Sequence, residues 1–387
     1  MDKKREAVIW GAGTYGKILL EVCRELDGFH ITAFYDINAD IQQTYINGIE
    51  VYTEEKFVRY MKDHPEAIVI IGVIHTEAVN EIKRGMEEYG LTENRTMNQR
   101  DIAREYREYI KNKGLPNKYE IDYEGQIAVW VDNLMEEVGF WCNEVAKKQK
   151  GSYAGQMRAE QFSCDRVMSI VKENDIVIDV GCGLVPQYGM ELPGGGGVEL
   201  LSIDPLAPFY NQINQKYADK APEIRFGLFE FLSKSLKKGY ADIILVDNAL
   251  DHCIDPFMSI LQCLCVLKPG GCLSLKHISN NAVYELYQGL HRWNLDCEQG
   301  DFIIWNQENY INVSKRLEGS VRIDVKQDKE SLQGWNNIVV NLTPSEKYRL
   351  EDFISPSQEG HQMAVIIKHL FEWMADSENN RVFRKML

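Results

Sequence analysis

The chain has 387 residues, of which 44% are hydrophobic and 26% charged, a composition typical of globular proteins with full hydrophobic cores. This length predicts two domains. The formal net charge of −15 argues against a nucleic-acid partner, because binding to phosphates requires a positively charged surface. A small basic cluster, residues 381–385, is interpreted as a solvated helix end. No segment has the about 18 consecutive apolar residues of a membrane span, so we expect none.

The cysteines indicate a reducing compartment and no metal site. There are nine of them, without a C-x-x-C pair, and their spacing does not match that of zinc ligands. We interpret them as small buried hydrophobes. The first residues lead directly into an expected strand and lack the apolar stretch of a signal peptide, so we expect a cytoplasmic protein.

Strands and helices alternate in the first part of the chain. Short apolar strands are expected at 7–10, 30–35 and 67–73, and an amphipathic helix at 77–89. This alternation predicts a parallel, doubly wound Rossmann-like α/β domain, to which we assign residues 1–105.

A glycine-rich motif, Gly11-Ala-Gly-Thr-Tyr-Gly16, lies between the first expected strand and the first expected helix. Backbone amides at a helix start suit a pyrophosphate, and the acidic Asp36 at the end of the next strand suits a ribose or a base. Taken alone, the motif indicates NAD. The candidate residues of this nucleotide site are Gly11, Gly13, Thr14, Tyr15, Gly16, Asp36 and Gly72.

Residues 6–90 have a more specific resemblance than the glycine motif alone. With Asn47-Gly-Ile-Glu-Val51 and the strand ending at Val73, this stretch resembles the small domain in front of sugar O-acyltransferases. The resemblance implies that the domain binds a nucleotide-linked sugar. A degenerate module used for docking or oligomerisation is the alternative. His75 is either a ligand contact or a surface residue.

The alternation stops and then restarts. Residues 106–150 are charged and helical in pattern, and we expect them to form a linker. Residues 151–345 are expected to form a second Rossmann-like domain, followed by a helical extension at 346–387. Parallel strands are predicted at 176–180, 198–203, 224–226, 241–246 and 272–276, and a helix at 256–267. Strands at 321–325 and 337–342 are expected to form an antiparallel pair.

The most informative stretch is Ile176-Val-Ile-Asp-Val-Gly-Cys-Gly183, a strand that runs into a turn with two glycines. The next strand ends in Asp204, a later one ends in Asp247, and Leu267-Lys-Pro-Gly-Gly271 follows. Ligands of open α/β sheets bind at the carboxyl ends of the strands. In this order, the motifs resemble those of class I S-adenosylmethionine-dependent methyltransferases, over residues 175–345.

The resemblance implies S-adenosylmethionine as the cofactor and a seven-stranded sheet with a terminal antiparallel pair. It also implies roles for individual residues. Asp179, Gly181, Cys182 and Gly183 would hold the methionine end, Asp204 the ribose, Phe229 and Glu230 the adenine, and Asp247 and Asn248 would lie near the sulfonium. Pro205 is a further candidate cofactor contact. Two features depart from the family: position 228, often acidic there, is Leu228, and the loop at 194–197 consists of four glycines.

Two histidines follow strands at the expected reaction edge. His252 is the first candidate for a general base and His277 the second, because an imidazole titrates near neutral pH. Either could instead be a structural histidine. Tyr153, Arg158 and Gln161 are candidates for closing over the methionine carboxylate. Residues 291–293 could wall the acceptor pocket or end a helix.

The sequence therefore predicts a methyltransferase acting on a small acceptor, with a sugar or nucleotide-sugar of surface-glycan synthesis as the favoured class. An inactive nucleotide-binding or docking protein is one alternative. An NAD-linked oxidoreductase that uses the first domain is another. The sequence does not decide between a monomer and a homo-oligomer.

Overall fold

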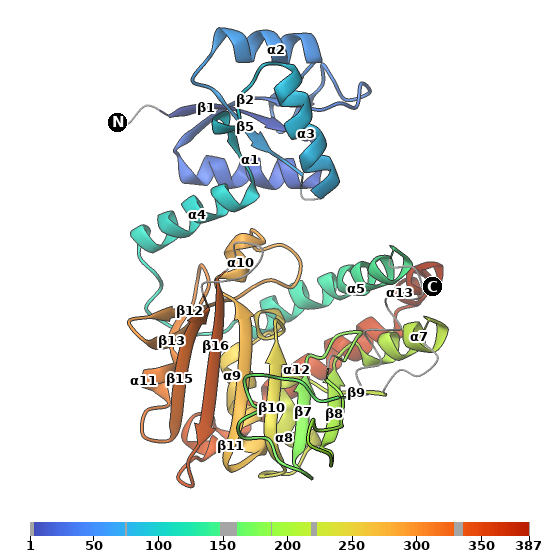
Figure 1. Ribbon diagram of the computed structural model, residues 1–387, viewed down its shortest axis with the longest axis vertical. Coiled ribbons are helices and arrows are strands. Elements are labelled where there is room, and N and C mark those ends of the chain that lie inside the picture. The colour runs from blue at the N-terminus through green and yellow to red at the C-terminus, as the bar shows by residue number, and fades with distance from the viewer. Residues whose placement is uncertain are drawn as a thin grey trace. The chain divides into compact units, whose positions relative to one another are not determined.

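The computed structural model describes residues 4–73, 76–147, 161–186, 188–217, 223–328 and 336–386 (Figure 1). The chain divides into two compact units. The first comprises residues 1–115 with 283–286, and the second comprises 116–282 with 287–387. Among the helices of the described residues, none combines the length and apolar character needed to cross a membrane.

The first unit contains a sheet of six strands in the order β3-β4-β2-β1-β5-β6. All neighbours pair in parallel except β3 and β4, which form an antiparallel hairpin. The strands are β1 (Arg5–Trp10), β2 (Phe29–Tyr35), β3 (Tyr45–Ile46), β4 (Ile49–Tyr52), β5 (Ile68–Ile71) and β6 (Thr96–Met97). The helices are α1 (Thr14–Leu26), α2 (Glu54–Asp63), α3 (Thr76–Glu88), η1 (Glu93–Arg95) and α4 (Gln99–Lys113).

Helix α4 is part of the first unit. Its N-terminus carries a capping box in which the Asn98 side chain accepts from the Asp101 amide and the Asp101 side chain accepts from the Asn98 amide. Further along, the Tyr106 hydroxyl donates to Glu25 Oε2 of α1 at 2.6 Å. The sequence predicted that this domain ends at 105, whereas the first unit continues through α4 to Leu115.

The second unit is built on a sheet of seven strands in the order β15-β16-β11-β10-β7-β8-β9. The strands from β11 to β9 are parallel, and β16 pairs antiparallel with both β11 and β15. This arrangement confirms the predicted class I methyltransferase fold with its terminal antiparallel pair. The strands are β7 (Ile176–Val180), β8 (Glu199–Asp204), β9 (Ile224–Phe226), β10 (Ala241–Asp247), β11 (Leu267–Ile278), β15 (Val321–Asp328) and β16 (Asn337–Pro344).

The two faces of this sheet bury different partners, because side chains alternate along a strand. Ile178 and Val180 face a core that includes every apolar side chain of α9 (Pro256–Val266) from Phe257 onward. Val177 faces the other way, toward a smaller core that contains Phe162 and Tyr188. The sequence of β7 is therefore mostly apolar, because both of its faces are buried.

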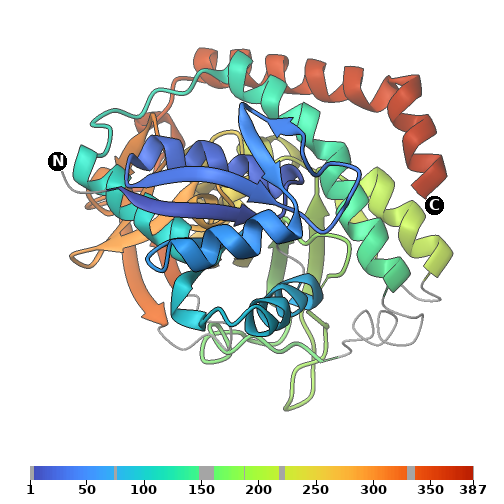
Figure 2. The same cartoon turned by 90° about the horizontal axis from the view of Figure 1, so that it is seen from above.

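A second group of helices packs around one end of the sheet. In α5 (Tyr123–Lys147), the residues Ile127, Trp130, Leu134 and Val138 recur at helical spacing and are buried. They share a core with α7 (Ala207–Tyr217), α12 (Pro356–Ala375) and α13 (Ser377–Met386). Figure 2 shows α5 and α12 side by side. The short helices are η2 (Phe229–Phe231), α8 (Leu232–Ser235), η3 (Leu250–His252), α10 (Asn281–Tyr284), α11 (Val313–Arg316) and η4 (Leu350–Asp352).

One small sheet departs from the sequence prediction. A three-stranded sheet, β12 (Asn294–Glu298), β13 (Asp301–Trp305) and β14 (Tyr310–Asn312), follows β11 and was not predicted. Gln299 and Gly300, both at positive φ, turn the chain between β12 and β13. The described residues of 184–198 form turns, bends and isolated bridges.

Candidate active site

The loop after β7 has the backbone that the sequence predicted. Gly181 has φ +69° and Gly183 has φ +65°, a left-handed conformation that favours glycine. A Cβ atom on Gly181 would lie 2.4 Å from the Ala249 Cβ and 2.8 Å from Cε2 of Phe229. The backbone therefore approaches its neighbours as closely as only glycine permits. Trp141 of α5 lies beside Gly183, where a Cβ would be 3.4 Å from its ring.

Asp204, at the end of β8, holds this loop in place. Its Oδ2 accepts from the Gly183 amide at 3.1 Å and its Oδ1 from the Leu206 amide at 2.8 Å. The carboxyl is 6% exposed, and this burial raises its pKa to about 7. Each carboxylate oxygen retains a second lone pair, so Asp204 can still accept from two ribose hydroxyls.

Asp179 and Asp247 bring two further carboxyl groups to the same edge. Burial raises the pKa of Asp179 to about 8, nearby Asp247 and Asp204 add to the rise, and Arg166 opposes it. Asp247 is engaged on both oxygens: Oδ1 accepts from Nη1 of Arg166, and Oδ2 accepts from the Tyr188 hydroxyl. The sequence placed Asp247 near the sulfonium but gave no sign of this ion pair.

These residues fit S-adenosylmethionine, which carries two positive charges and a carboxylate. Three acidic side chains, Asp179, Asp204 and Asp247, lie close together at the carboxyl ends of β7, β8 and β10, beside the glycine loop. In the described part of the chain, the buried Nε of Arg166 has no hydrogen-bond partner, so it remains a donor for a ligand oxygen.

The remaining residues predicted to bind the cofactor have mixed surroundings. Phe229 is buried with its ring against Gly181, whereas Cys182 and Pro205 are half-buried. Glu230 accepts from the Ile254 amide at 2.8 Å and the Asp255 amide at 3.3 Å. These bonds give it a structural role at the start of α9 and do not support adenine binding. Asn248, at φ +48°, accepts from the Ile278 amide at 2.9 Å and thus joins the ends of β10 and β11.

His252 lies in η3, just beyond the end of β10, in a cluster that we call the histidine cluster: Asp251, His252, His277, Asn281 and His291. The Nδ1 of His291 is 2.8 Å from Asp251 Oδ2 and 3.1 Å from His252 Nε2. The rings of His252 and His291 meet edge to face, with centroids 4.5 Å apart. Their side chains are 22% and 30% exposed, so a substrate can reach this side of the cluster.

Asp251 is fully buried beneath the two imidazoles. Burial by itself raises its pKa, but His252, His291 and His277 together lower it well below the ordinary value. Asn281 Nδ2 also donates to its Oδ2 at 3.0 Å, and the backbone carbonyl of Asp251 accepts from the Arg292 amide at 3.1 Å. The segment after α10 is thereby fixed to the end of β10.

His277 is buried, and its surroundings favour the structural alternative over a role as general base. It is 1% exposed, its Nε2 accepts from the Leu250 amide at 3.3 Å, and its Nδ1 faces Asp251 Oδ1 at 3.8 Å. Burial lowers its pKa to about 4, so the ring is neutral with its proton on Nδ1. His277 thus holds the backbone of Leu250, the residue before Asp251.

The glycine motif of the first unit shows the same construction as the loop after β7. Asp36 Oδ2 accepts from the Ala12 amide at 2.8 Å and Oδ1 from the Asn38 amide at 2.9 Å. Gly11 has φ +111°, and a Cβ on Gly16 would lie 1.9 Å from its carbonyl oxygen. Gly72 closes the turn from β5, since a Cβ there would lie 2.7 Å from the same oxygen.

The start of α1 is more open. A Cβ on Gly13, the N-cap residue, would meet nothing within 4 Å, and no side chain caps the helix. Thr14 is exposed and Tyr15 half-buried.

Sequence reasoning missed three members of the site. Arg166, Asp251 and Asn281 carry no local motif that would mark them in the sequence. Of the residues expected to close over the methionine carboxylate, Gln161 makes a bridge with Glu191. Tyr153, Arg158 and His75 lie outside the described residues.

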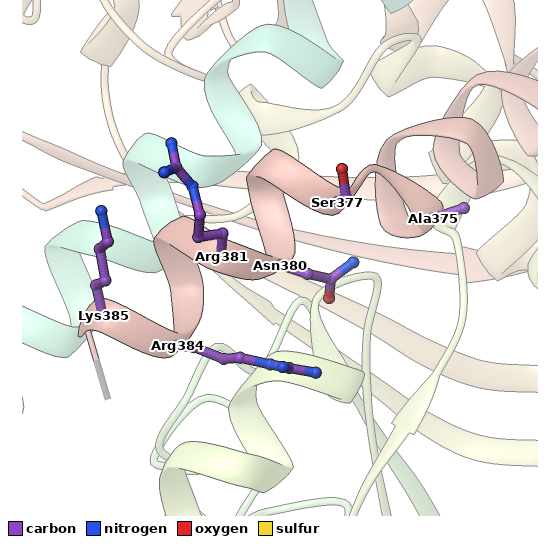
Figure 3. Close-up of a pocket in the computed structure, with 6 residues that line it drawn as sticks. All are labelled: Ala375, Ser377, Asn380, Arg381, Arg384 and Lys385. Carbon is purple, nitrogen blue, oxygen red and sulfur yellow. The ribbon is translucent and has the colours of Figure 1, made fainter.

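The described residues also line a pocket of about 620 Å³ at the joint of α12 and α13. Its walls are Ala375, Ser377, Asn380, Arg381, Arg384 and Lys385 (Figure 3). It includes the basic cluster expected to be a solvated helix end, and none of its residues comes from the strand ends described above.

Comparison with known proteins gives a family match for the second unit. Residues 178–275 match the family described as methyltransferase domain. No curated protein matches the chain.

Among solved structures, similarity is low. A UDP-D-quinovosamine 4-dehydrogenase from Vibrio fischeri is 22% identical, with 25% of this chain and 78% of that chain covered and a TM-score of 0.22. The CurJ carbon methyltransferase is 14% identical (47% and 52% covered, TM-score 0.34), so this chain spans about half of its length. A 1,6-didemethyltoxoflavin-N1-methyltransferase from Burkholderia thailandensis is 12% identical (55% and 88% covered, TM-score 0.32).

The matched residues span most of β7, all of β8 and β10, and most of β11. Asp179, Asp204 and Asp247 lie on the first three of these strands. Residues 178–275 thus match a methyltransferase domain and lie in a sheet with the class I strand order, which implies S-adenosylmethionine as the cofactor.

Proposed function

We propose that this protein transfers the methyl group of S-adenosylmethionine to an oxygen or nitrogen atom of a small acceptor. The observation that carries this proposal is the cradle formed by Gly181, Gly183 and Asp204. There, a loop with two left-handed glycines is hydrogen-bonded to a buried carboxylate that keeps further lone pairs for a ligand. As part of this proposal, Asp204 binds the ribose of the cofactor and Asp179 binds its methionine end.

The chemistry asks little of the protein beyond alignment. The cofactor supplies a methyl group on a positively charged sulfur. A lone pair of the acceptor forms the new bond to the methyl carbon while the carbon–sulfur bond breaks and its electrons return to sulfur. Holding the acceptor in line with this bond provides most of the acceleration. We assign the acceptor to the exposed side of the histidine cluster. There the acceptor atom loses its proton to solvent.

The acceptor that we propose is a sugar or a nucleotide-sugar. The net charge of −15 disfavours nucleic acid. The open start of α1 and the anchored Asp36 support a nucleotide in the first unit. We propose that this nucleotide is sugar-linked, in line with the resemblance of residues 6–90.

Calorimetric titration with S-adenosylmethionine tests the cofactor site. We expect the Asp204→Ala variant to bind at least tenfold more weakly than the wild type, because charge-assisted hydrogen bonds contribute about 1.5–3 kcal/mol each. Asp324→Ala is the matched control, since Asp324 is 60% exposed on β15. Equal affinity in both variants would show that the ribose lies elsewhere. No binding by the wild type would favour the inactive docking protein.

Methyl uptake from labelled cofactor into a panel of nucleotide-sugars and free sugars tests the acceptor. Labelling of a sugar by the wild type and not by the Asp204→Ala variant supports the proposal. A parallel fluorescence titration with NADH tests the oxidoreductase alternative. Tight binding of NADH to the first unit would support that alternative.

A further inference from the structure

The histidine cluster brings three potential metal ligands together. Asp251 Oδ2, His252 Nε2 and His291 Nδ1 lie 2.8, 3.1 and 4.0 Å apart in pairs. Around an ion with bonds of about 2.1 Å, tetrahedral ligands are separated by about 3.4 Å. The mutual spacing of the three atoms is therefore that of a coordination sphere.

His291 lies at the centre of this spacing. Its Nδ1 is close to Asp251 Oδ2, to His252 Nε2 and, at 3.1 Å, to the Asn281 amide. An imidazole nitrogen carries either one proton or one lone pair. A protonated Nδ1 can donate to Asp251 Oδ2. An unprotonated Nδ1 directs its lone pair toward the same region as the carboxylate oxygen and His252 Nε2, which is how ligands converge on a cation.

We propose that Asp251, His252 and His291 bind a divalent transition-metal ion, with open positions toward the acceptor. Two imidazoles and one carboxylate suit Zn²⁺, Co²⁺, Mn²⁺ or Fe²⁺ better than Mg²⁺, which prefers oxygen ligands. This site replaces the expectation, drawn from cysteine spacing, that the chain has no metal site.

Asn281 provides a fourth ligand. The oxygen and nitrogen of an amide exchange places by a half-turn of the side chain. After that turn, Oδ1 of Asn281 takes the position 3.0 Å from Asp251 Oδ2 and 3.1 Å from His291 Nδ1. The donor set then has two nitrogens and two oxygens.

The surroundings of the ligands support the assignment. Asp251 is fully buried, and its Oδ1 has no hydrogen-bond partner among the described residues, although the protonated Nδ1 of His277 faces it at 3.8 Å. A carboxylate that binds metal through one oxygen commonly has the other oriented by a neighbouring donor. The His252 carbonyl accepts from Trp130 Nε1 at 3.0 Å, which fixes that ligand from α5.

The ion deepens the proposed function, on which its role in catalysis rests. A hydroxyl group bound to it would lose its proton to solvent more readily, and the resulting oxygen would be the atom that receives the methyl group. Binding of the ion itself does not depend on methyl transfer.

The experiment uses the full chain freed of metal with a chelator and titrated calorimetrically with Zn²⁺, and with Co²⁺ followed by visible absorption. We expect one ion per chain and a Co²⁺ spectrum typical of nitrogen and oxygen ligands. His252→Ala and His291→Ala are expected to weaken binding at least tenfold. His361→Ala is the control, because His361 is exposed on α12.

Titration of the same variants with S-adenosylmethionine separates the two proposals and shows that the variants are folded. Cofactor binding together with an absence of metal binding by the wild type, or with unchanged metal affinity in both histidine variants, would overturn the metal site and leave the methyltransferase intact. Metal binding that is lost in both variants supports the site even if no methyl acceptor is found.

Discussion

Arg166 and Asp247 form an ion pair at the carboxyl end of β10, although 81 residues separate them in the chain. The side chains are 10% and 23% exposed, and Nη2 of Arg166 also donates to the Tyr188 hydroxyl at 3.1 Å. The pair ties the segment that precedes β7 to the strand end nearest the histidine cluster. Without Arg166, the carboxylate of Asp247 would have no cationic partner among the described residues at this strand end.

Replacing Arg166 by Met is expected to lower the free energy of unfolding by about 3–5 kcal/mol, because it leaves the carboxylate of Asp247 uncompensated. Tyr188→Phe, which removes one hydroxyl from the same carboxylate, is expected to cost about 1–2 kcal/mol. Chemical denaturation measures both. Equal, small losses for the two variants would show that the ion pair contributes little.

The affinity for S-adenosylmethionine is expected to rise with pH up to about 7. Asp204 is protonated below its pKa of about 7, and the cationic cofactor favours the ionised form. Each pH unit below that value should weaken binding by up to about tenfold. Calorimetry from pH 5.5 to 8 would measure the slope, and Asp204→Asn should reduce it. A flat profile for the wild type would contradict the role of Asp204.

The free energy of unfolding in the absence of cofactor is expected to fall between pH 6.5 and 8.5. The folded-state pKa of Asp179 is about 8, far above that of an unfolded aspartate, so the folded chain binds more protons in this interval and loses stability as they leave. Asp179→Asn should be less sensitive to pH. Thermal unfolding of both proteins across this interval is the measurement, and identical slopes would count against the raised pKa.

His277 is expected to act through position rather than proton transfer. In His277→Ala, the Leu250 amide loses its acceptor, which should cost about 1–3 kcal/mol of stability. The Kd for S-adenosylmethionine should stay within about twofold, whereas kcat should fall because Asp251 is less well held. A kcat–pH profile that keeps its shape in the variant would agree with this role, and loss of one limb would identify His277 as a base after all.

The glycines of the first unit are expected to respond differently to alanine. Gly16→Ala places a Cβ 1.9 Å from the Gly11 carbonyl oxygen, so α1 must shift, at a cost of about 3 kcal/mol. Gly13→Ala meets no neighbour within 4 Å and should leave the unfolding curve nearly unchanged. Limited proteolysis and circular dichroism compare the two. An equally stable Gly16→Ala protein would mean that the loop relaxes readily.

The sequence was sufficient to predict the parallel strands and the glycine loops, because these depend on local patterns. The run from Ile176 to Val180 is apolar since both faces of β7 are buried. Gly181 and Gly183 were identifiable because a tight turn after a strand requires their backbone angles.

The sequence could not predict the contacts that complete the site. His291 reaches Asp251 across 40 residues, through a connection that contains α10 and has no motif of its own. The small sheet β12–β14 was missed although Gly300 marks its hairpin, because short apolar stretches are ambiguous between strand and buried loop. Pairings of this kind depend on the packing of distant segments.

Asp36 and Asp204 each bond the glycine loop of their own unit before any ligand arrives. A side chain tethered in this way has already given up its rotational freedom, so a sugar hydroxyl that docks on it needs to immobilise nothing further. If both loops bind nucleotides as we propose, folding has already placed the carboxylate and the loop backbone, and binding should be fast and leave the backbone nearly unmoved.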